Sequence, residues 1–375
     1  MHHWLFAILL ISALGARAQE PDLGARAQEP ALGARAQEPG LGARAQEADE
    51  SDDSDSDSPE AESEIVPPAA LGPDVRYSSD LSDEELKRRW EEDLLSLGSI
   101  SVGFADKGRL INSAQMPEDP AWMCSRPDLA WGAQETIEAL STAFRAVHER
   151  FPDSTPARLS QISARDGGYL RPHRSHQSGR DADVGFFYKT GAVPRAGVPR
   201  KRLLDPERNW ALLRALITET DVQVILLDRR IQQVLKKHAI AAGEDREWID
   251  RVFGKIIKHA RRHRDHFHVR FYAPRSQELG RRIQPLLALR PEQNLVLHKV
   301  RQGQTLGHIA VTYGTTVALI RATNHMRGSF LPLGQQLAVP LRKPCTKCPL
   351  PPPVVVPPRC LPAEVPAVAT AGVAP

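Results

Sequence analysis

The segment from His263 to Phe271 carries three histidines within six positions, a density that suits chemistry on a metal or a proton. In an extended strand alternate side chains point to the same side, so His266 and His268 would share one face. Phe267 and the apolar residues that alternate with the histidines would share the other face and could be buried. Taken alone, this pattern is equally typical of a basic strand edge in solvent.

A second polar segment lies upstream, over residues 173–187. Acidic and apolar residues alternate in its second half, which predicts a strand with one polar and one apolar face. His176 lies on the loop that enters this strand before Asp183, and Gly179 permits a sharp turn between them. If the two strands are neighbours, then His176, Asp183 and His268 form a set of three ligands. Three protein ligands and one open position for water are what catalytic zinc requires.

Zinc would lower the pKa of its water to about 7 and polarise a scissile carbonyl, and a base that is not a ligand must then take the proton. His266 and His263 are the candidates. His266 shares the face of His268 and is only two residues away. Asp265 would point to the other face of a regular strand, from where it could orient a histidine. The sequence leaves open which histidine takes the proton.

The two segments together resemble the signature of the LAS peptidases, His176-x6-Asp183 combined with His266-x-His268. More narrowly, they are similar to the penicillin-insensitive murein endopeptidases, the MepA family, through His173-x-x-His176-Gln-x-Gly-Arg-Asp-x-Asp183 and His263-x-Asp-His266-Phe-His268-Val-Arg270. The likeness covers residues 96–285 and includes Ser96-Leu-Gly-Ser99, Gly103, Trp131-Gly132 and residues 163–168. It implies an α+β fold with a LAS-type antiparallel sheet.

This resemblance implies a zinc endopeptidase that cleaves the D-alanyl–meso-diaminopimelyl bond between cross-linked stem peptides of peptidoglycan. It implies Zn2+ bound by His176, Asp183 and His268. It also implies that His263 and His266 are catalytic histidines and that His173 is a further active-site histidine. Such an enzyme has no active-site serine and escapes β-lactams. A zinc D,D- or L,D-carboxypeptidase on the same fold is one alternative. A catalytically silent peptidoglycan-binding protein is another, although no ligand or base of the motif is missing.

A second unit is predicted over residues 297–342, with a linker at 288–296. Thr305 and Thr316 can each cap a helix, and Gly314 can end the first in a left-handed turn. Flanking strands complete a small β-α-α-β unit. Its residues, from His298-Lys-Val-Arg-Gln-Gly-Gln-Thr-Leu306 to Gly334-Gln-Gln-Leu-Ala-Val-Pro340, resemble the LysM module. That resemblance implies binding to glycan strands of peptidoglycan; a LysM-like fold without a ligand is the alternative. His298 and Gln304 replace residues that are often Tyr and Asp in the module.

Local patterns predict helices that alternate with short strands. Ser82-Asp-Glu-Glu85 has the form of a capping box that opens a helix to about Leu95, at the end of a linker and helix over 65–95. Apolar periodicity predicts further helices at 134–149, 206–218, 229–241 and 246–262, and a strand at 222–227. Together these elements predict an α+β domain over 96–287.

The ends of the chain read as export and linker sequence. An apolar run followed by Ala16-Arg17-Ala18 predicts a signal peptide over 1–18 and a periplasmic or wall-associated protein, and the run is too short to span a membrane. Residues 19–64, with repeats of Leu-Gly-Ala-Arg-Ala-Gln-Glu and an acidic stretch, and the Pro-rich residues 343–375 predict disorder. Cys345-x-x-Cys348 favours a disulfide over a metal site.

Charge is distributed unevenly along the chain. Residues 1–64 hold 4 basic and 14 acidic residues, a net charge of −10, whereas residues 65–375 hold 45 and 32, a net charge of +13. The basic part favours an anionic partner, such as peptidoglycan or nucleic acid. The export signal and the lack of a nucleic-acid motif disfavour nucleic acid. Arg180 and Arg270 could hold stem-peptide carboxylates or could pair with aspartates such as Asp181.

Overall fold

The structure is a computed structural model that describes residues 77–170, 173–195, 200–343, 345 and 348–363. The predicted signal peptide (1–18), the repeat and acidic segment (19–64), the start of the predicted linker (65–76) and the end of the tail (364–375) lie outside these residues. Among the described helices, none is both long and apolar enough to cross a membrane.

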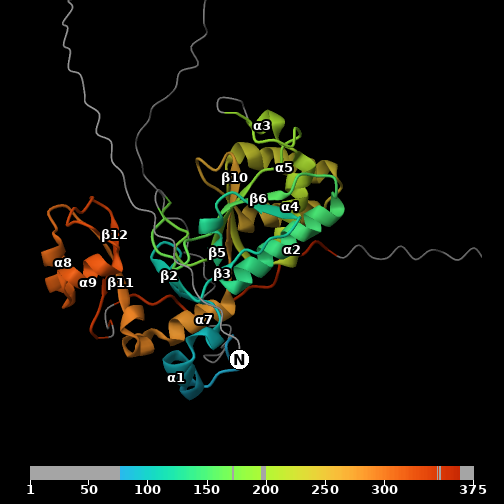
Figure 1. Cartoon of the computed structure of the whole chain (residues 1–375). Coiled ribbons are helices and arrows are strands. Elements are labelled where there is room, and N and C mark those ends of the chain that lie inside the picture. Colours follow the sequence, from blue (N-terminus) through green and yellow to red (C-terminus); the bar gives the residue numbers. More distant parts are fainter. Residues whose placement is uncertain (1–76, 171–172, 196–199, 344, 346–347, 364–375) are drawn as a thin grey trace, which may run out of the picture. The chain divides into compact units, whose positions relative to one another are not determined.

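The chain alternates helices and strands from residue 83 onward (Figure 1). The first elements are α1 (Asp83–Glu92), η2 (Leu94–Leu97), β1 (Ile100–Gly103), β2 (Gly108–Ile111), β3 (Ala114–Gln115), β4 (Trp122–Cys124), η3 (Pro127–Leu129), β5 (Trp131–Gly132), α2 (Gln134–Arg150), β6 (Ala157–Gln161) and β7 (Asp181–Gly185). They are followed by α3 (Arg200–Leu203), α4 (Pro206–Glu219), β8 (Val222–Leu227), α5 (Arg229–Ala241), α6 (Arg246–Arg251), η4 (Val252–Ile256), β9 (Ile257–His259), β10 (His266–Phe271), α7 (Pro274–Arg282), η5 (Gln284–Leu289) and η6 (Pro291–Gln293). The elements through η5 form what we call the α+β domain.

A six-stranded sheet with the order β4-β6-β7-β10-β8-β9 organises the α+β domain. Its four central strands, β6, β7, β10 and β8, are antiparallel neighbours. The two edge strands run parallel to their neighbours, β4 beside β6 and β9 beside β8. The expected mixture of helices and strands is therefore present, and the predicted antiparallel arrangement holds for the four central strands. The two edge strands differ from it and are reached through the helical connections α2 and α5–α6.

One face of the sheet is apolar and is covered by helices. Phe267, Val269 and Val184 are fully buried and pack in one cluster with residues of α2, α4 and α5. Each such side chain contributes about 1.5–3 kcal/mol by leaving water. This burial fixes which residues of β7 and β10 face outward, because the side chains of a strand alternate and a slip of one residue would bury the polar set.

Most predicted helices form where their patterns place them. Ser82 caps α1 by accepting a hydrogen bond from Glu85 N, as the capping box requires. The Trp90 indole, on the apolar face of α1, donates to Leu286 O across a second buried cluster. The helices predicted at 134–149, 206–218 and 229–241 correspond to α2, α4 and α5.

The helix predicted over 246–262 is wrong in its second half. The α-helix ends at Arg251, a π-helical turn occupies Val252–Ile256, and β9 begins at Ile257. Ile257 is buried opposite Ile225 of β8. Glycine and β-branched residues in this stretch weaken a helix, and the open edge of β8 offers the backbone partners that a strand needs. The apolar run alone could not distinguish the two outcomes.

The C-terminal unit has the predicted β-α-α-β order. Its elements are β11 (Leu295–Lys299), α8 (Leu306–Tyr313), α9 (Val317–Thr323) and β12 (Gln336–Pro340), and the two strands are antiparallel. Thr305 and Thr316 cap the helices through their hydroxyl groups, and Gly314 ends α8 with φ 64°. A separate cluster that includes Ile309, Ile320 and Leu337 forms its core.

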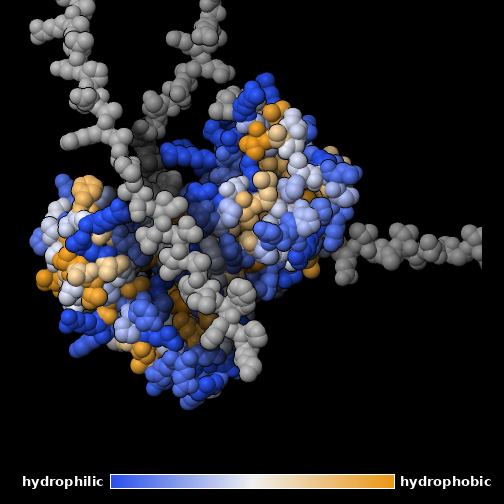
Figure 2. Space-filling view, viewed as in Figure 1, coloured by the Kyte–Doolittle hydropathy of each residue, from blue (hydrophilic) through white to orange (hydrophobic). Residues whose placement is uncertain are grey.

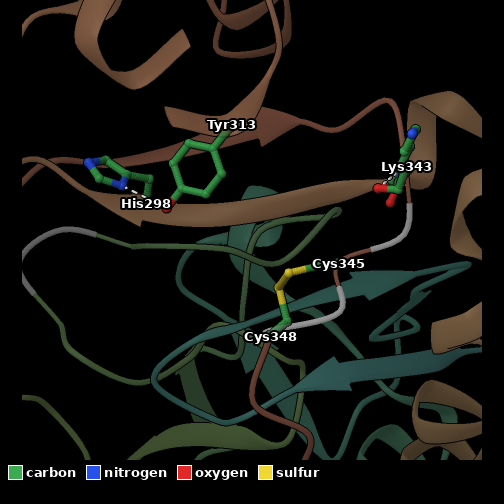
Figure 3. Close-up of a disulfide and its surroundings, with 6 residues drawn as sticks. His298, Tyr313, Lys343, Cys345 and Cys348 are labelled. Atoms are coloured by element: carbon green, nitrogen blue, oxygen red, sulfur yellow. Dashed lines mark hydrogen bonds between the residues drawn. A yellow bond between two sulfur atoms is a disulfide. The ribbon is translucent and has the colours of Figure 1, made fainter. Parts of the chain in front are cut away.

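The described part of the tail is extended and bonded. Cys345 and Cys348 form a disulfide (Figure 3), whereas Cys124 and Cys360 carry free thiols. The Trp248 indole donates to Cys360 O at 2.8 Å, and Arg359 pairs with Asp221 at 2.8 Å. Proline has already restricted residues 348–363, so ordering this segment against the α+β domain costs little entropy.

Candidate metal centre

The pairing of β7 with β10 brings the two predicted segments together. His268 lies opposite Asp183, His266 opposite Gly185 and Arg270 opposite Asp181. These residues occupy the face of the sheet opposite the apolar core. The predicted neighbourhood of the two strands is therefore present, and it arises because each strand buries its alternate apolar residues.

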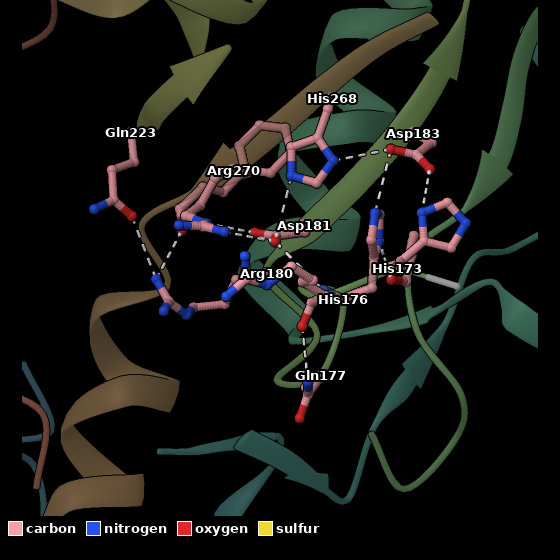
Figure 4. Close-up of polar contacts among 12 residues, drawn as sticks. His173, His176, Gln177, Arg180, Asp181, Asp183, Gln223, His268 and Arg270 are labelled. Atoms are coloured by element: carbon pink, nitrogen blue, oxygen red, sulfur yellow. Dashed lines mark hydrogen bonds and ion pairs between the residues drawn. The ribbon is translucent and has the colours of Figure 1, made fainter. Parts of the chain in front are cut away.

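Three donor atoms converge on the outer face of β7 and β10 (Figure 4). His176 Nε2 lies 3.2 Å from Asp183 Oδ1, and His268 Nδ1 lies 3.1 Å from the same oxygen. The His176 and His268 rings have centroids 4.8 Å apart. All three side chains are at least nine-tenths buried. Two donors bound tetrahedrally to one zinc ion would be about 3.3 Å apart, given metal–ligand distances near 2.0–2.1 Å. The two spacings to Asp183 Oδ1 therefore fit that ion.

His176 is held in place by its backbone and by its other ring nitrogen. Its φ of 68° lies in the left-handed region, which is uncommon for residues other than glycine. Its Nδ1 lies 2.7 Å from Ile162 O, the geometry of an N–H donated to the carbonyl. Nε2 faces Asp183 Oδ1, and it is buried and without a hydrogen-bond partner among the described residues. A buried ring nitrogen beside a carboxylate is what a metal ligand requires, and the local strain coincides with that function.

Asp181 contacts Arg270 and His268 next to the three converging donor atoms. It accepts two hydrogen bonds from the Arg270 guanidinium, at 2.7 and 2.9 Å, and its Oδ2 lies 3.4 Å from His268 Nε2 (Figure 4). The alternative in which Arg270 pairs with Asp181 is thus the one the structure shows. Arg180 is also buried, and it contacts Gln223 and the Phe271 carbonyl. Both guanidinium groups thus bond within the protein, and the alternative that they hold substrate carboxylates stays a prediction.

His266 stands beside the ligands with a carboxylate behind it. Its Nε2 lies 3.6 Å from Asp183 Oδ1, and its Nδ1 lies 2.8 Å from Asp265 Oδ1. Asp265 in turn pairs with Arg200 of α3. The predicted orienting role of Asp265 therefore has the required contact. His263 packs against both His266 and His268, with ring centroids 5.1 and 5.6 Å away, so both predicted proton carriers adjoin the ligands.

The structure adds Gln161, a residue that the motifs did not include. Its amide nitrogen lies 2.8 Å from His173 Nε2 and donates to Asp183 Oδ2 at 2.9 Å. Leu159 is opposite Val184 and Gln161 is opposite Asp183, so the strand has one extra residue at Ser160. This bulge turns Gln161 to the outer face, which regular alternation from the buried Leu159 would not do. No sequence pattern marked the bulge.

His173 offers a second possible third ligand. Donor atoms of His173, His176 and Asp183 lie within 4.8 Å of one another and could hold a metal ion. His173 Nδ1 is, however, 4.0 Å from Asp183 Oδ2, and its ring is about one-third exposed. His268 lies closer to the shared carboxylate and has Asp181 behind it. The group that meets this criterion thus contains His173, and the predicted set, with His268 in its place, shares His176 and Asp183 with it.

Charge interactions within the cluster follow from burial and proximity. Burial by itself would raise the pKa of Asp183, but His176 and His268 hold that pKa well below its ordinary value. Burial likewise opposes a charge on His268, yet Asp181 and Asp183 raise its pKa to about 10. Burial and the charge of His268 lower the pKa of His263 to about 4. Without a metal, His268 is therefore the cation of the cluster and His263 is neutral.

The C-terminal unit carries its own histidine network, away from any carboxylate. His298 Nδ1 lies 2.9 Å from the Tyr313 hydroxyl (Figure 3), and Nε2 lies 2.9 Å from Gln304 Oε1. The surface over α8, α9 and β12 mixes apolar and polar areas (Figure 2), and Val311, Phe330 and Leu333 are largely exposed in this unit.

Comparison with known proteins bears on this unit. Residues 298–340 match the LysM domain family. The match confirms the predicted LysM domain over nearly its whole predicted length and supports binding to peptidoglycan. LysM domains are typical of extracellular and cell-wall proteins. A comparison with curated proteins gave no match.

Proposed function

We propose that the chain is a zinc endopeptidase of peptidoglycan cross-links, exported to the periplasm or cell wall and directed to its substrate by the LysM domain. The observation that carries this proposal is the convergence of His176 Nε2, Asp183 Oδ1 and His268 Nδ1 at zinc-ligand spacing. The motifs that resemble the murein endopeptidases support the choice of substrate, a D-alanyl–meso-diaminopimelyl bond.

A zinc ion bound here would supply a Lewis acid for the scissile carbonyl and a more acidic water. The chain's own residues then have separable tasks. Asp181 and Ile162 O orient the His268 and His176 rings. His266, held by Asp265, is placed to accept a proton at Nε2, the nitrogen that faces Asp183. His263 is neutral at pH 7 because burial lowers its pKa, so it can also accept one.

The LysM domain adds affinity for the glycan strands between which the cross-links lie. Binding at one domain raises the effective concentration of substrate at the other. The net charge of +13 on residues 65–375 acts in the same direction, because stem peptides are anionic. The intact donor set favours an enzyme over a catalytically silent binding protein, since a silent protein has no need of it.

Mass spectrometry of a muropeptide digest is the direct test. Mature protein incubated with purified cross-linked dimers should release monomers, lose activity with a chelator, regain it with zinc and ignore penicillin. Release of a terminal D-alanine instead of monomers would assign the chain to the zinc carboxypeptidases. Intact dimers at every zinc concentration would exclude peptidase activity on this bond.

A second arm separates targeting from catalysis. Deletion of residues 297–342 should weaken pull-down by insoluble peptidoglycan while soluble dimers are cleaved as before. Retention of the deleted protein on peptidoglycan at wild-type affinity would contradict the role of the LysM domain.

A further inference from the structure

Arg158 of β6 lies on the same outer face of the sheet as the metal centre. Side chains that are opposite one another on neighbouring strands form a row across this face, and Arg158 belongs to the row next to that of the metal centre. It is opposite Gly185 of β7, which is opposite His266 of β10. The neighbouring row contains Gln161, Asp183 and His268. Two rows on one face of a sheet are about 7 Å apart along the strand. The Arg158 side chain therefore starts within reach of any group bound beside His266.

The Arg158 guanidinium lies flat over the backbone of Gly185. A Cβ added to Gly185 would be 2.4 Å from Arg158 Nη2 and 2.5 Å from its Nε. Only a residue without a side chain leaves room for the guanidinium there. The absence of a side chain at Gly185 thus positions this cation between β6 and β10, against the outer face of the sheet.

Arg158 has no counter-charge of its own. Its Nε is buried without a hydrogen-bond partner, and within the described part of the chain the guanidinium makes no ion pair. Arginines elsewhere around the site are paired, Arg270 with Asp181 and Arg200 with Asp265. An unpaired, partly buried guanidinium costs free energy unless an anion binds to it.

A second unsatisfied donor lies in the same neighbourhood. The Tyr188 hydroxyl is buried and has no hydrogen-bond partner among the described residues. Burial raises the pKa of Tyr188, and the charges of Arg200 and Arg158 oppose that rise. Asp265 adds to the rise, so the charges around this hydroxyl have both signs. Tyr188 packs against Phe186 in the apolar cluster, so the unsatisfied donor that lies in the row of His266 is the Arg158 Nε.

We propose that Arg158, seated on Gly185, is the binding site for a substrate carboxylate and selects substrates that carry one next to the scissile bond. This inference rests on the proposed function. In a D-alanyl–meso-diaminopimelyl cross-link, the carbon that bears the scissile nitrogen also bears a carboxylate. That group lies two bonds from the reacting nitrogen, which matches the separation of one row between Arg158 and the metal centre. A planar guanidinium can hold both carboxylate oxygens.

The test compares two cross-linked dimers that differ only at this group, one with the free carboxylate and one with a carboxamide. Wild-type protein should prefer the acid in kcat/KM by roughly 10- to 100-fold, the range expected for a charge-assisted hydrogen bond. In Arg158→Gln the preference should fall to within about twofold. Gly185→Ala should reduce it as well, because the new methyl group displaces the guanidinium, and it does so without touching Arg158 itself.

Arg202→Gln is the matched control, since it removes an exposed arginine of α3 and should keep the preference of the wild type. Thermal unfolding shows whether each variant is folded. A wild type without preference, or an Arg158→Gln variant that retains it, overturns the assignment.

A binding arm keeps this inference distinct from the proposed function. Calorimetry with zinc-free protein and the two released monomers, acid and amide, should show tighter binding of the acid to wild type and equal binding to Arg158→Gln. If wild type binds the acid selectively but cleaves neither dimer, the peptidase proposal fails and the anion site stands. If wild type binds both monomers equally, or neither, the anion site is refuted whatever the cleavage result.

Discussion

Two histidines in this chain, His176 and His298, show how burial and bonding separate a ligand from a structural residue. Both ring nitrogens of His298 have partners, the Tyr313 hydroxyl and Gln304 Oε1. His176 bonds through Nδ1 only, and its Nε2 is buried and unsatisfied beside Asp183. Unmade hydrogen bonds in a folded interior are costly. The difference indicates that the α+β domain holds an unsatisfied site for a ligand, whereas the LysM histidine completes a local network.

The largest effect should come from removing a zinc ligand. His268→Ala should lower cleavage of soluble dimers by roughly 1000-fold, because several kcal/mol of charge stabilisation depend on the ion. Bound zinc measured by atomic absorption should fall in parallel. The matched substitution in the other domain, His298→Ala, should change neither quantity. Full zinc occupancy and full activity in His268→Ala would refute the ligand set, and the same experiment on His173→Ala decides between the two overlapping sets.

The next largest effect should come from Asp265, the carboxylate that contacts His266 Nδ1. Asp265→Asn should lower kcat by roughly 10- to 100-fold, the range for groups that orient an active-site histidine. Zinc content and KM should stay near wild type, because Asp265 touches no ligand directly. A change in zinc content instead of kcat would mean that Asp265 supports the metal and not the base.

The affinity of the candidate metal centre for zinc should rise with pH, whereas no such dependence is expected of the His298 network. In the metal-free protein, Asp181 and Asp183 raise the pKa of His268 to about 10, so a proton must leave when zinc binds. Each released proton makes the affinity about tenfold tighter per pH unit. Chelator competition between pH 6 and 8 measures the slope. A flat profile would show that His268 binds zinc without losing a proton.

The smallest effect should follow from His298→Phe. The variant leaves the Tyr313 hydroxyl and Gln304 without their partner, at a cost of about 1 kcal/mol since both groups are only half-buried. Hydrogen exchange at amides of α8 and β12 would report the loss locally. Cleavage of soluble dimers should not change. Stability lost in β7 and β10 would instead show that the two networks are coupled.

The sequence predicted the parts of the site that depend on regular alternation. His266, His268 and Asp183 face outward because Phe267, Val269 and Val184 are buried, and that pattern is visible in the residues themselves. The β-α-α-β order of the C-terminal unit was predicted from its caps and turn, which are local signals, and the LysM domain from the resemblance of its residues to that module. The long helices with clear apolar periodicity, α2, α4 and α5, also lie where the sequence predicted them.

What the sequence could not predict depends on irregular or distant contacts. Gln161 reaches the site only through the bulge at Ser160, which reverses the alternation of β6. Arg158 gains its position from an absent side chain at Gly185, on another strand. Residues 252–262 do not continue the predicted helix, because β9 forms within them and pairs with β8. The motifs left open whether Arg270 pairs with Asp181, and the pairing of β7 with β10 brings the two together.

The pairing of β7 with β10 has a consequence for how the protein matures. Asp183 and His268 are separated by 85 residues, and α4, β8, α5 and α6 lie between them in the chain. Closing so long a loop is entropically costly, so this pairing belongs among the slow steps of folding. The donor set does not exist before that step. A chain in which β7 and β10 have not yet paired therefore holds no assembled candidate metal centre, so any chemistry that needs all three donors waits for the domain to fold.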